Sequence, residues 1–134
     1  MRIAGPARRL GAWALDAAIA GVVFLPLNPA LYSDELHGSR FTALLAASFV
    51  LLFAYLVAFD GGERGATPGK RILGLRVADA DTGGPIGLRR AAVRRVVYVV
   101  GGSACYLGWL WLFANERRQS WHDKAARTVV VRVP

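Results

Sequence analysis

Hydrophobic residues in this chain are collected into three long blocks, separated by polar connections rich in arginine. The clearest block, residues 41–59, has 19 residues and no charge. A hydrocarbon core about 30 Å thick needs about 20 residues at 1.5 Å per residue, so this block predicts a transmembrane helix. A chain of 134 residues is too short to bury three such blocks in a soluble core. The pattern therefore predicts a membrane protein.

The other two blocks are each interrupted. Residues 10–27 are apolar except for Asp16, and prolines end the block. A signal peptide is the alternative for this block, but Asp16 breaks its apolar region and no A-x-A cleavage site follows. Residues 96–114 carry no charge, but Gly101, Gly102 and Ser103 interrupt them. We expect both blocks to be embedded in the membrane as helical segments.

The polar connections predict a small β element and a surface helix. Residues 72–77 alternate loosely, a turn-rich run follows, and the tail sequence TVVVRV is a second strand former that can pair with the first. Residues 86–95 predict a basic amphipathic helix on the membrane surface, with its apolar side chains on one face and its arginines on the other. The expected fold is an all-α membrane protein of about three embedded segments with a short cytoplasmic β element, forming one domain over residues 1–134.

Basic residues in the connections predict the orientation. The arm before the first block has three, the loop 28–40 has one, and the connection 60–95 has eight, so the N-terminus is expected in the cytoplasm. Three crossings would then place the tail outside, although the tail carries five basic residues. Either the third block turns back at residues 101–103, which leaves both termini cytoplasmic, or it crosses despite its charges, or a larger assembly holds it. We favour the first interpretation.

Charge and composition exclude several classes of function. The formal net charge is +8, and there are 15 arginines against two lysines. On a membrane protein such a basic surface favours contact with anionic lipid headgroups over nucleic acid. The single Cys105 excludes an internal disulfide, and His37 and His122 are too few for a histidine-rich metal site. No catalytic set is recognisable, so we expect neither an enzyme nor a cofactor.

Asp16 is the first candidate for a functional residue, because an ionised carboxylate inside an apolar block is costly unless it is paired. The favoured interpretation is a structural ion pair with Arg9, Arg94 or Arg95, or a protonated Asp16 close to the membrane interface, and a proton-relay or transport role is the alternative. His122 and Asp123 suggest a metal or general-base pair, but too few ligands are available. Asp123 is expected instead to cap a helix or to pair with an arginine.

Residues 67–71 form a second candidate motif. The glycine spacing and the residue after Lys70 do not fit a phosphate-binding loop of the Walker type. We expect Thr67, Pro68 and Gly69 to make a tight turn at the membrane exit, with Lys70 and Arg71 meeting lipid phosphate.

Together these segments resemble the RDD family of small bacterial integral membrane proteins. The resemblance rests on ARRLGAWALDAAI, TPGKRILGLRV, AAVRR and RRQSWHDKAARTVVV. These segments are spread from residue 7 to residue 131, so the resemblance extends over nearly the whole chain. It implies that Arg9, Asp16 and Asp123 are the residues that name the family. Two positions depart from the family pattern, Trp121 where an aliphatic residue is usual and Arg127 where glycine is common. The other recurrent positions of the family fall on Thr67, Pro68, Gly69, Lys70, Gly74, Arg94 and His122.

The resemblance implies a multi-pass protein of the bacterial cytoplasmic (inner) membrane. Family members are mostly uncharacterised, are described as transport-related, and include proteins linked to sodium/proton exchange. We expect a non-enzymatic accessory or scaffold subunit that binds another membrane protein or copies of itself, together with anionic lipid. The alternative is an oligomeric sodium/proton antiporter that uses Asp16.

Overall fold

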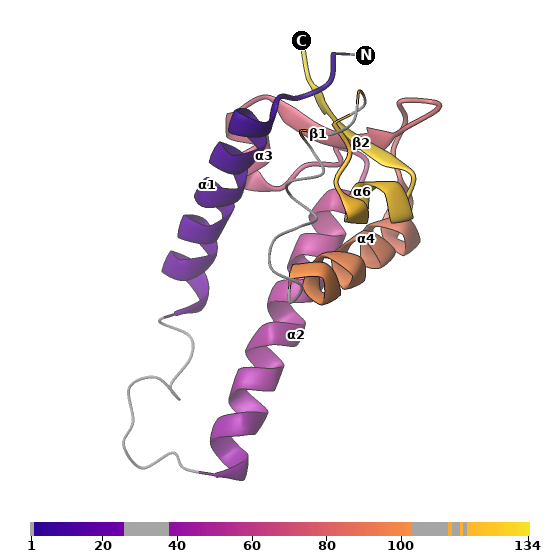
Figure 1. Cartoon of the computed structure of the whole chain (residues 1–134). Coiled ribbons are helices and arrows are strands. Elements are labelled where there is room, and N and C mark those ends of the chain that lie inside the picture. Colours follow the sequence, from indigo (N-terminus) through magenta and orange to yellow (C-terminus); the bar gives the residue numbers. More distant parts are fainter. Residues whose placement is uncertain (1, 26–37, 103–112, 114–115, 117) are drawn as a thin grey trace.

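The computed structural model describes residues 2–25, 38–102, 113, 116 and 118–134. Two long helices extend from a polar head that holds a two-stranded sheet and the shorter helices (Figure 1). Among the described helices, α2 is long and apolar enough to cross a membrane. The elements in chain order are α1 (Pro6–Phe24), α2 (Ser39–Gly61), α3 (Pro68–Ile72), β1 (Leu75–Asp79), α4 (Gly87–Gly102), α6 (Trp121–Ala125) and β2 (Thr128–Arg132).

The long helices confirm two of the three apolar blocks as helical. Pro6 occupies the first turn of α1, where its missing N–H costs no hydrogen bond. Helix α1 has 19 residues and includes Arg8, Arg9 and Asp16, and its crossing of the membrane stays a prediction. Helix α2 has 23 residues and contains the whole uncharged block 41–59.

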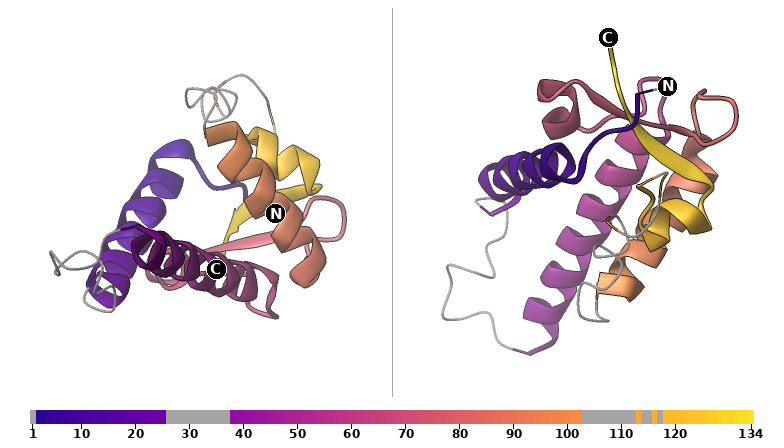
Figure 2. Two further views of the ribbon diagram at one scale, coloured as in Figure 1. Left: turned by 90° about the horizontal axis from the view of Figure 1, so that it is seen from below. Right: turned by 45° about the horizontal axis from the view of Figure 1, so that its top comes forward.

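The sheet confirms the predicted pairing of the central connection with the tail. Strands β1 and β2 are antiparallel, with Leu75 opposite Arg132 and Asp79 opposite Thr128. The N-terminal segment joins the free edge of β2, where Ala4 N donates to Val130 O at 2.8 Å. Both chain ends therefore lie at the same end of the molecule (Figures 1 and 2). The first strand begins later than expected, because residues 68–72 form α3.

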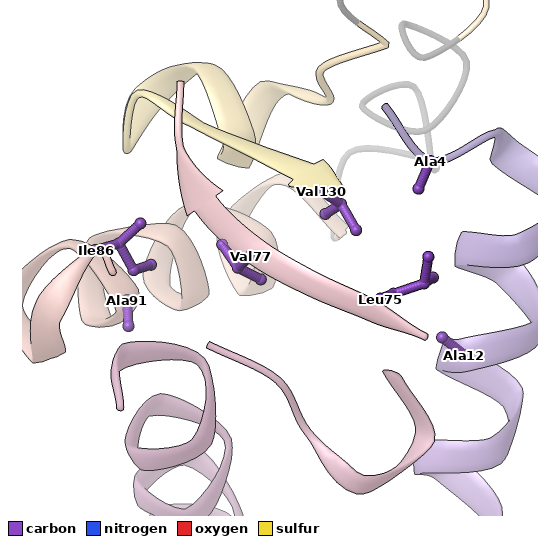
Figure 3. Packing of buried hydrophobic residues seen from close by; sticks show 7 residues of the cluster. All are labelled: Ala4, Ala12, Leu75, Val77, Ile86, Ala91 and Val130. Carbon is purple, nitrogen blue, oxygen red and sulfur yellow. The ribbon is translucent and has the colours of Figure 1, made fainter. Parts of the chain in front are cut away.

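A small apolar core fills the head around β1. Leu75 lies beside Ala12 of α1 at the start of the strand, and Val77 in the middle of the strand belongs to the same core cluster as Ile86 and Ala91 (Figure 3). Small side chains let the backbones approach closely here. A Cβ added at Gly61 would lie 2.7 Å from Leu88 Cα, so only glycine at the end of α2 lets α4 begin against it.

Helix α4 extends the predicted surface helix and shows which of its side chains face the protein. It runs without a break from Gly87 to Gly102, so Gly101 does not interrupt it. Arg94 faces the interior of the head and is 6% exposed, whereas Leu88 and Val93 are 59% and 42% exposed and Ala91 packs in the core. Arg94 faces inward because buried carboxylates bind it. Whether the third block turns back or crosses concerns residues that lie outside the described part.

Candidate functional site

The first of two buried carboxylates at the centre of the head belongs to Asp123 of α6. Its Oδ2 accepts a hydrogen bond from Arg9 Nη2 at 2.7 Å, and its Oδ1 accepts one from Arg94 Nε at 2.8 Å. Burial alone would raise the pKa of Asp123, but the Arg94 and Arg9 guanidinium groups outweigh it and hold that pKa well below its ordinary value. The Ser120 hydroxyl also donates to Oδ2, at 2.9 Å, and the Ser120 backbone N–H donates to the same oxygen at 3.3 Å as part of a capping box at the start of α6. Both roles predicted for Asp123, cap and arginine partner, are confirmed.

Asp60, in the last turn of α2, is the second buried carboxylate. A carboxylate is unfavourable at a helix C-terminus unless cations surround it. Here the Lys70 ammonium group donates to Oδ1, while Arg94 Nη1 and Arg95 Nη2 each donate to Oδ2 at 2.8 Å. Arg94 therefore bridges Asp60 and Asp123, and the ion pairs join α1, α2, α3, α4 and α6. We call this set the buried ion network, and it consists of Arg9, Asp60, Lys70, Arg94, Arg95 and Asp123.

Lys70 has a different position from the one predicted for it. Its side chain is 12% exposed and pairs with Asp60 inside the head, so it is not directed to lipid phosphate. Burial lowers the pKa of Lys70 to about 8, although the Asp60 carboxylate acts in the opposite direction. Arg71 does reach the surface, where its guanidinium group lies 5.1 Å from the centre of the Phe59 ring.

Asp16 does not pair with the arginines that the sequence suggested. Its Oδ2 accepts from Thr67 Oγ1 at 2.5 Å, and its Oδ1 accepts from Gly69 N at 2.7 Å. Arg9, seven positions earlier on α1, lies about 10 Å away along the helix axis and binds Asp123 instead. Asp16 thus binds the start of α3, where unpaired backbone N–H groups favour an anion.

The Thr67–Arg71 motif forms the first turns of α3 rather than a simple turn. Thr67 is the N-cap residue and Pro68 takes the first position, which suits its fixed φ. A Cβ at Gly69 would lie 2.5 Å from Ala12 O, so only glycine lets α3 approach α1 closely enough for Asp16 to bind it. The motif therefore attaches the polar head to the first helix.

His122 packs beside the buried ion network. Its ring meets the Tyr98 ring edge to face at 5.2 Å, and its Nε2 lies 2.8 Å from Ser120 Oγ. Burial lowers the pKa of His122 to about 3, so the ring is neutral at pH 7. His122 Nε2 lies 3.7 Å from Asp123 Oδ1, but because the ring is neutral the two groups do not form an ion pair at that pH.

Sequence reasoning missed three members of the site, namely Asp60, Arg95 as its partner, and Ser120. One signal was available for Asp60, since it is the acid directly after the clearest apolar block and precedes a connection with eight basic residues. A carboxylate directly at the end of an apolar block indicates a partner for some of those bases. Which bases it pairs with depends on tertiary contacts that no local pattern encodes.

A pocket of about 300 Å³ lies between α1, α2 and α4 and borders the buried ion network. Asp16 and His122 line it together with the network's cationic residues. Its remaining lining is mostly apolar and comes from α1 and α2.

Comparisons with known proteins show which sequences this chain is similar to. The chain is 33% identical over 81 residues to a "Proline-rich antigen homolog" of Mycobacterium tuberculosis (strain ATCC 25618 / H37Rv), which covers 58% of the chain and 34% of that protein. It is also 33% identical over 85 residues to the "Proline-rich antigen" of Mycobacterium leprae (strain TN), covering 61% of the chain and 34% of that protein. The chain thus spans about a third of the length of these relatives. No solved structure matches it.

The family comparison covers much more of the chain than these relatives do. The model of the RDD family matches residues 3–127. This range includes Arg9, Asp16 and Asp123 as well as the Thr67–Arg71 motif. The chain therefore belongs to the RDD family of membrane proteins.

Proposed function

We propose that this protein is a non-enzymatic accessory or scaffold subunit of a larger membrane complex. The observation that carries the proposal is that internal donors occupy Asp16, Asp60 and Asp123. A carboxylate that catalyses or carries ions must exchange its partners, whereas these three hold helices together. Their arrangement supports an architectural role.

The outward face of α4 supplies the surface for the partner. Arg94 and Arg95 fix the inner face of this helix on Asp60, so its orientation is set. Val93, Val96 and Val100 consequently point outward and are 42%, 50% and 68% exposed. A rigid apolar face of this kind suits packing against a helix of another membrane protein.

Native mass spectrometry of the protein, extracted gently from its own membrane, tests this function. We expect a stoichiometric complex with a larger membrane protein. Val96→Trp should weaken that complex, because a helix interface has no room for the ring, whereas Val22→Trp on the 77% exposed position of α1 should not. A lone monomer or a homo-oligomer without a partner would contradict the accessory role. Equal complex formation by both variants would exclude the α4 face as the interface.

One observation favours the antiporter as a second candidate, since Asp16 lines the pocket between the helices. For that function Asp16 would have to release Thr67 and Gly69 to bind a proton or a sodium ion. Asp16→Asn would then abolish sodium/proton exchange in proteoliposomes while leaving assembly intact. A scaffold instead loses stability with the same substitution.

A further inference from the structure

The pocket between α1, α2 and α4 has two chemically different ends. Ala17 and Ala20 of α1 and Phe49 and Phe53 of α2 line one part of it. Arg9, Lys70, Arg94 and Arg95 line the part beside the buried ion network. An apolar slot that ends in cationic side chains matches an amphiphile with an anionic head.

The charges at the polar end do not balance. Four cationic side chains of the buried ion network face two carboxylates, Asp60 and Asp123. Asp16 on the pocket wall is already bound by Thr67 and Gly69, and even when it is included an excess of positive charge remains. Uncompensated charge in a buried site is costly, so an anion at this end would be stabilised.

Two hydrogen-bond donors at the same end are also unpaired. Within the described part of the chain, the buried Nε atoms of Arg9 and Arg95 have no hydrogen-bond partner. The Arg9 side chain is 6% exposed, so water does not freely replace a partner. Buried donors are normally satisfied, and arginine suits the oxygens of a phosphate.

We propose that this pocket binds an anionic phospholipid, with its phosphate at Arg9 and Arg95 and part of one acyl chain along the apolar wall. The wall runs along α2, the helix that is long and apolar enough to cross the membrane, so the chain enters from the bilayer rather than from water. A volume of about 300 Å³ holds a phosphate and a short length of one chain, and the rest of the lipid stays in the bilayer. The bound phosphate compensates the positive excess at the cationic end of the pocket.

The test measures lipid retention and thermal stabilisation of the purified full chain with phosphatidylglycerol, phosphatidylcholine and inorganic phosphate as separate probes. We expect one retained phosphatidylglycerol per chain and at least a tenfold preference over phosphatidylcholine. Ala20→Phe fills the apolar slot and should reduce phosphatidylglycerol binding at least tenfold. Ala18→Phe is the matched control, since Ala18 is an exposed residue of α1 outside the pocket, and it should bind like the wild type.

A second variant tests the contribution of the lipid headgroup separately from that of the acyl chain. Arg95→Gln should reduce the preference for phosphatidylglycerol to that for phosphatidylcholine, provided that circular dichroism shows the same helix content. Equal retention of both lipids by the wild type would overturn the proposal, as would unchanged phosphatidylglycerol binding in Ala20→Phe. Stabilisation by inorganic phosphate as strong as by the lipid would also overturn it and would indicate a site for a free anion.

Discussion

Arg9 and Asp123 are 114 positions apart in the chain, yet they form a hydrogen-bonded ion pair of 2.7 Å with both side chains buried. Together with Asp16, they are the residues that the family resemblance singled out. The structure shows that the three do not form one cluster. Arg9 and Asp123 join α1 to α6, whereas Asp16 joins α1 to α3.

Removing the charge of Asp123 should be severely destabilising. Asp123→Asn leaves the buried guanidinium groups of Arg9 and Arg94 without their carboxylate, and the loss of one partner of a buried pair costs about 3–5 kcal/mol. Urea unfolding in detergent, followed by circular dichroism, measures the free energy of unfolding. Asp81→Asn on the exposed turn is the control and should stay within about 0.5 kcal/mol. Equal stability of both variants would contradict the buried ion network.

Gly69→Ala should separate α3 from α1. The added methyl group would lie 2.5 Å from Ala12 O, and neither backbone can move without weakening the bond from Gly69 N to Asp16. We expect a loss of about 1–3 kcal/mol in the free energy of unfolding. Gly21→Ala on α1 is the matched control, because a Cβ there meets nothing within 4 Å and alanine is the better helix former. If Gly69→Ala left the free energy of unfolding unchanged, α3 and α1 would be less closely packed than the structure indicates.

Arg127→Gly should stabilise the protein. Arg127 has a φ of 51°, in the left-handed region that disfavours residues with a Cβ, and its side chain is exposed. This geometry favours the glycine that the family resemblance implies at this position. Relief of the strain should raise the free energy of unfolding by about 1 kcal/mol, which a thermal melt detects as a higher Tm. A lower Tm would mean that the arginine side chain contributes more than the strain costs.

The stability of the protein should depend on pH through His122. Burial lowers its pKa from 6.5 to about 3, so between these values the unfolded chain binds the proton and the folded chain does not. Stability therefore falls as the pH decreases from 6.5 toward 3, by about 1.4 kcal/mol per pH unit. Unfolding measured between pH 6.5 and 4.5 should show this slope in the wild type, and His122→Gln should reduce it by that amount. An unchanged slope would mean that another group causes the dependence.

The sequence predicted those elements that have a regular local pattern of hydrophobic residues. The uncharged block became α2, and the alternating segment paired with the β-branched tail. The orientation of α4 could not be predicted in the same way. The sequence indicated an apolar face and a basic face but not which of them packs on the protein, because the carboxylates that bind Arg94 are Asp60 and Asp123, 34 and 29 positions away. The partners of Asp16 were missed because backbone N–H groups, which every sequence has, bind it as well as a cation would.

We infer that these carboxylates hold the fold together and do not carry ions. This inference is tested by measuring the Tm and the pH-driven sodium flux in proteoliposomes of both the wild type and Asp16→Asn. We expect no flux from the wild type and a lower Tm for the variant, because Asn cannot accept both the Thr67 and Gly69 bonds as the carboxylate does. Exchange by the wild type that disappears in Asp16→Asn at an unchanged Tm would contradict it.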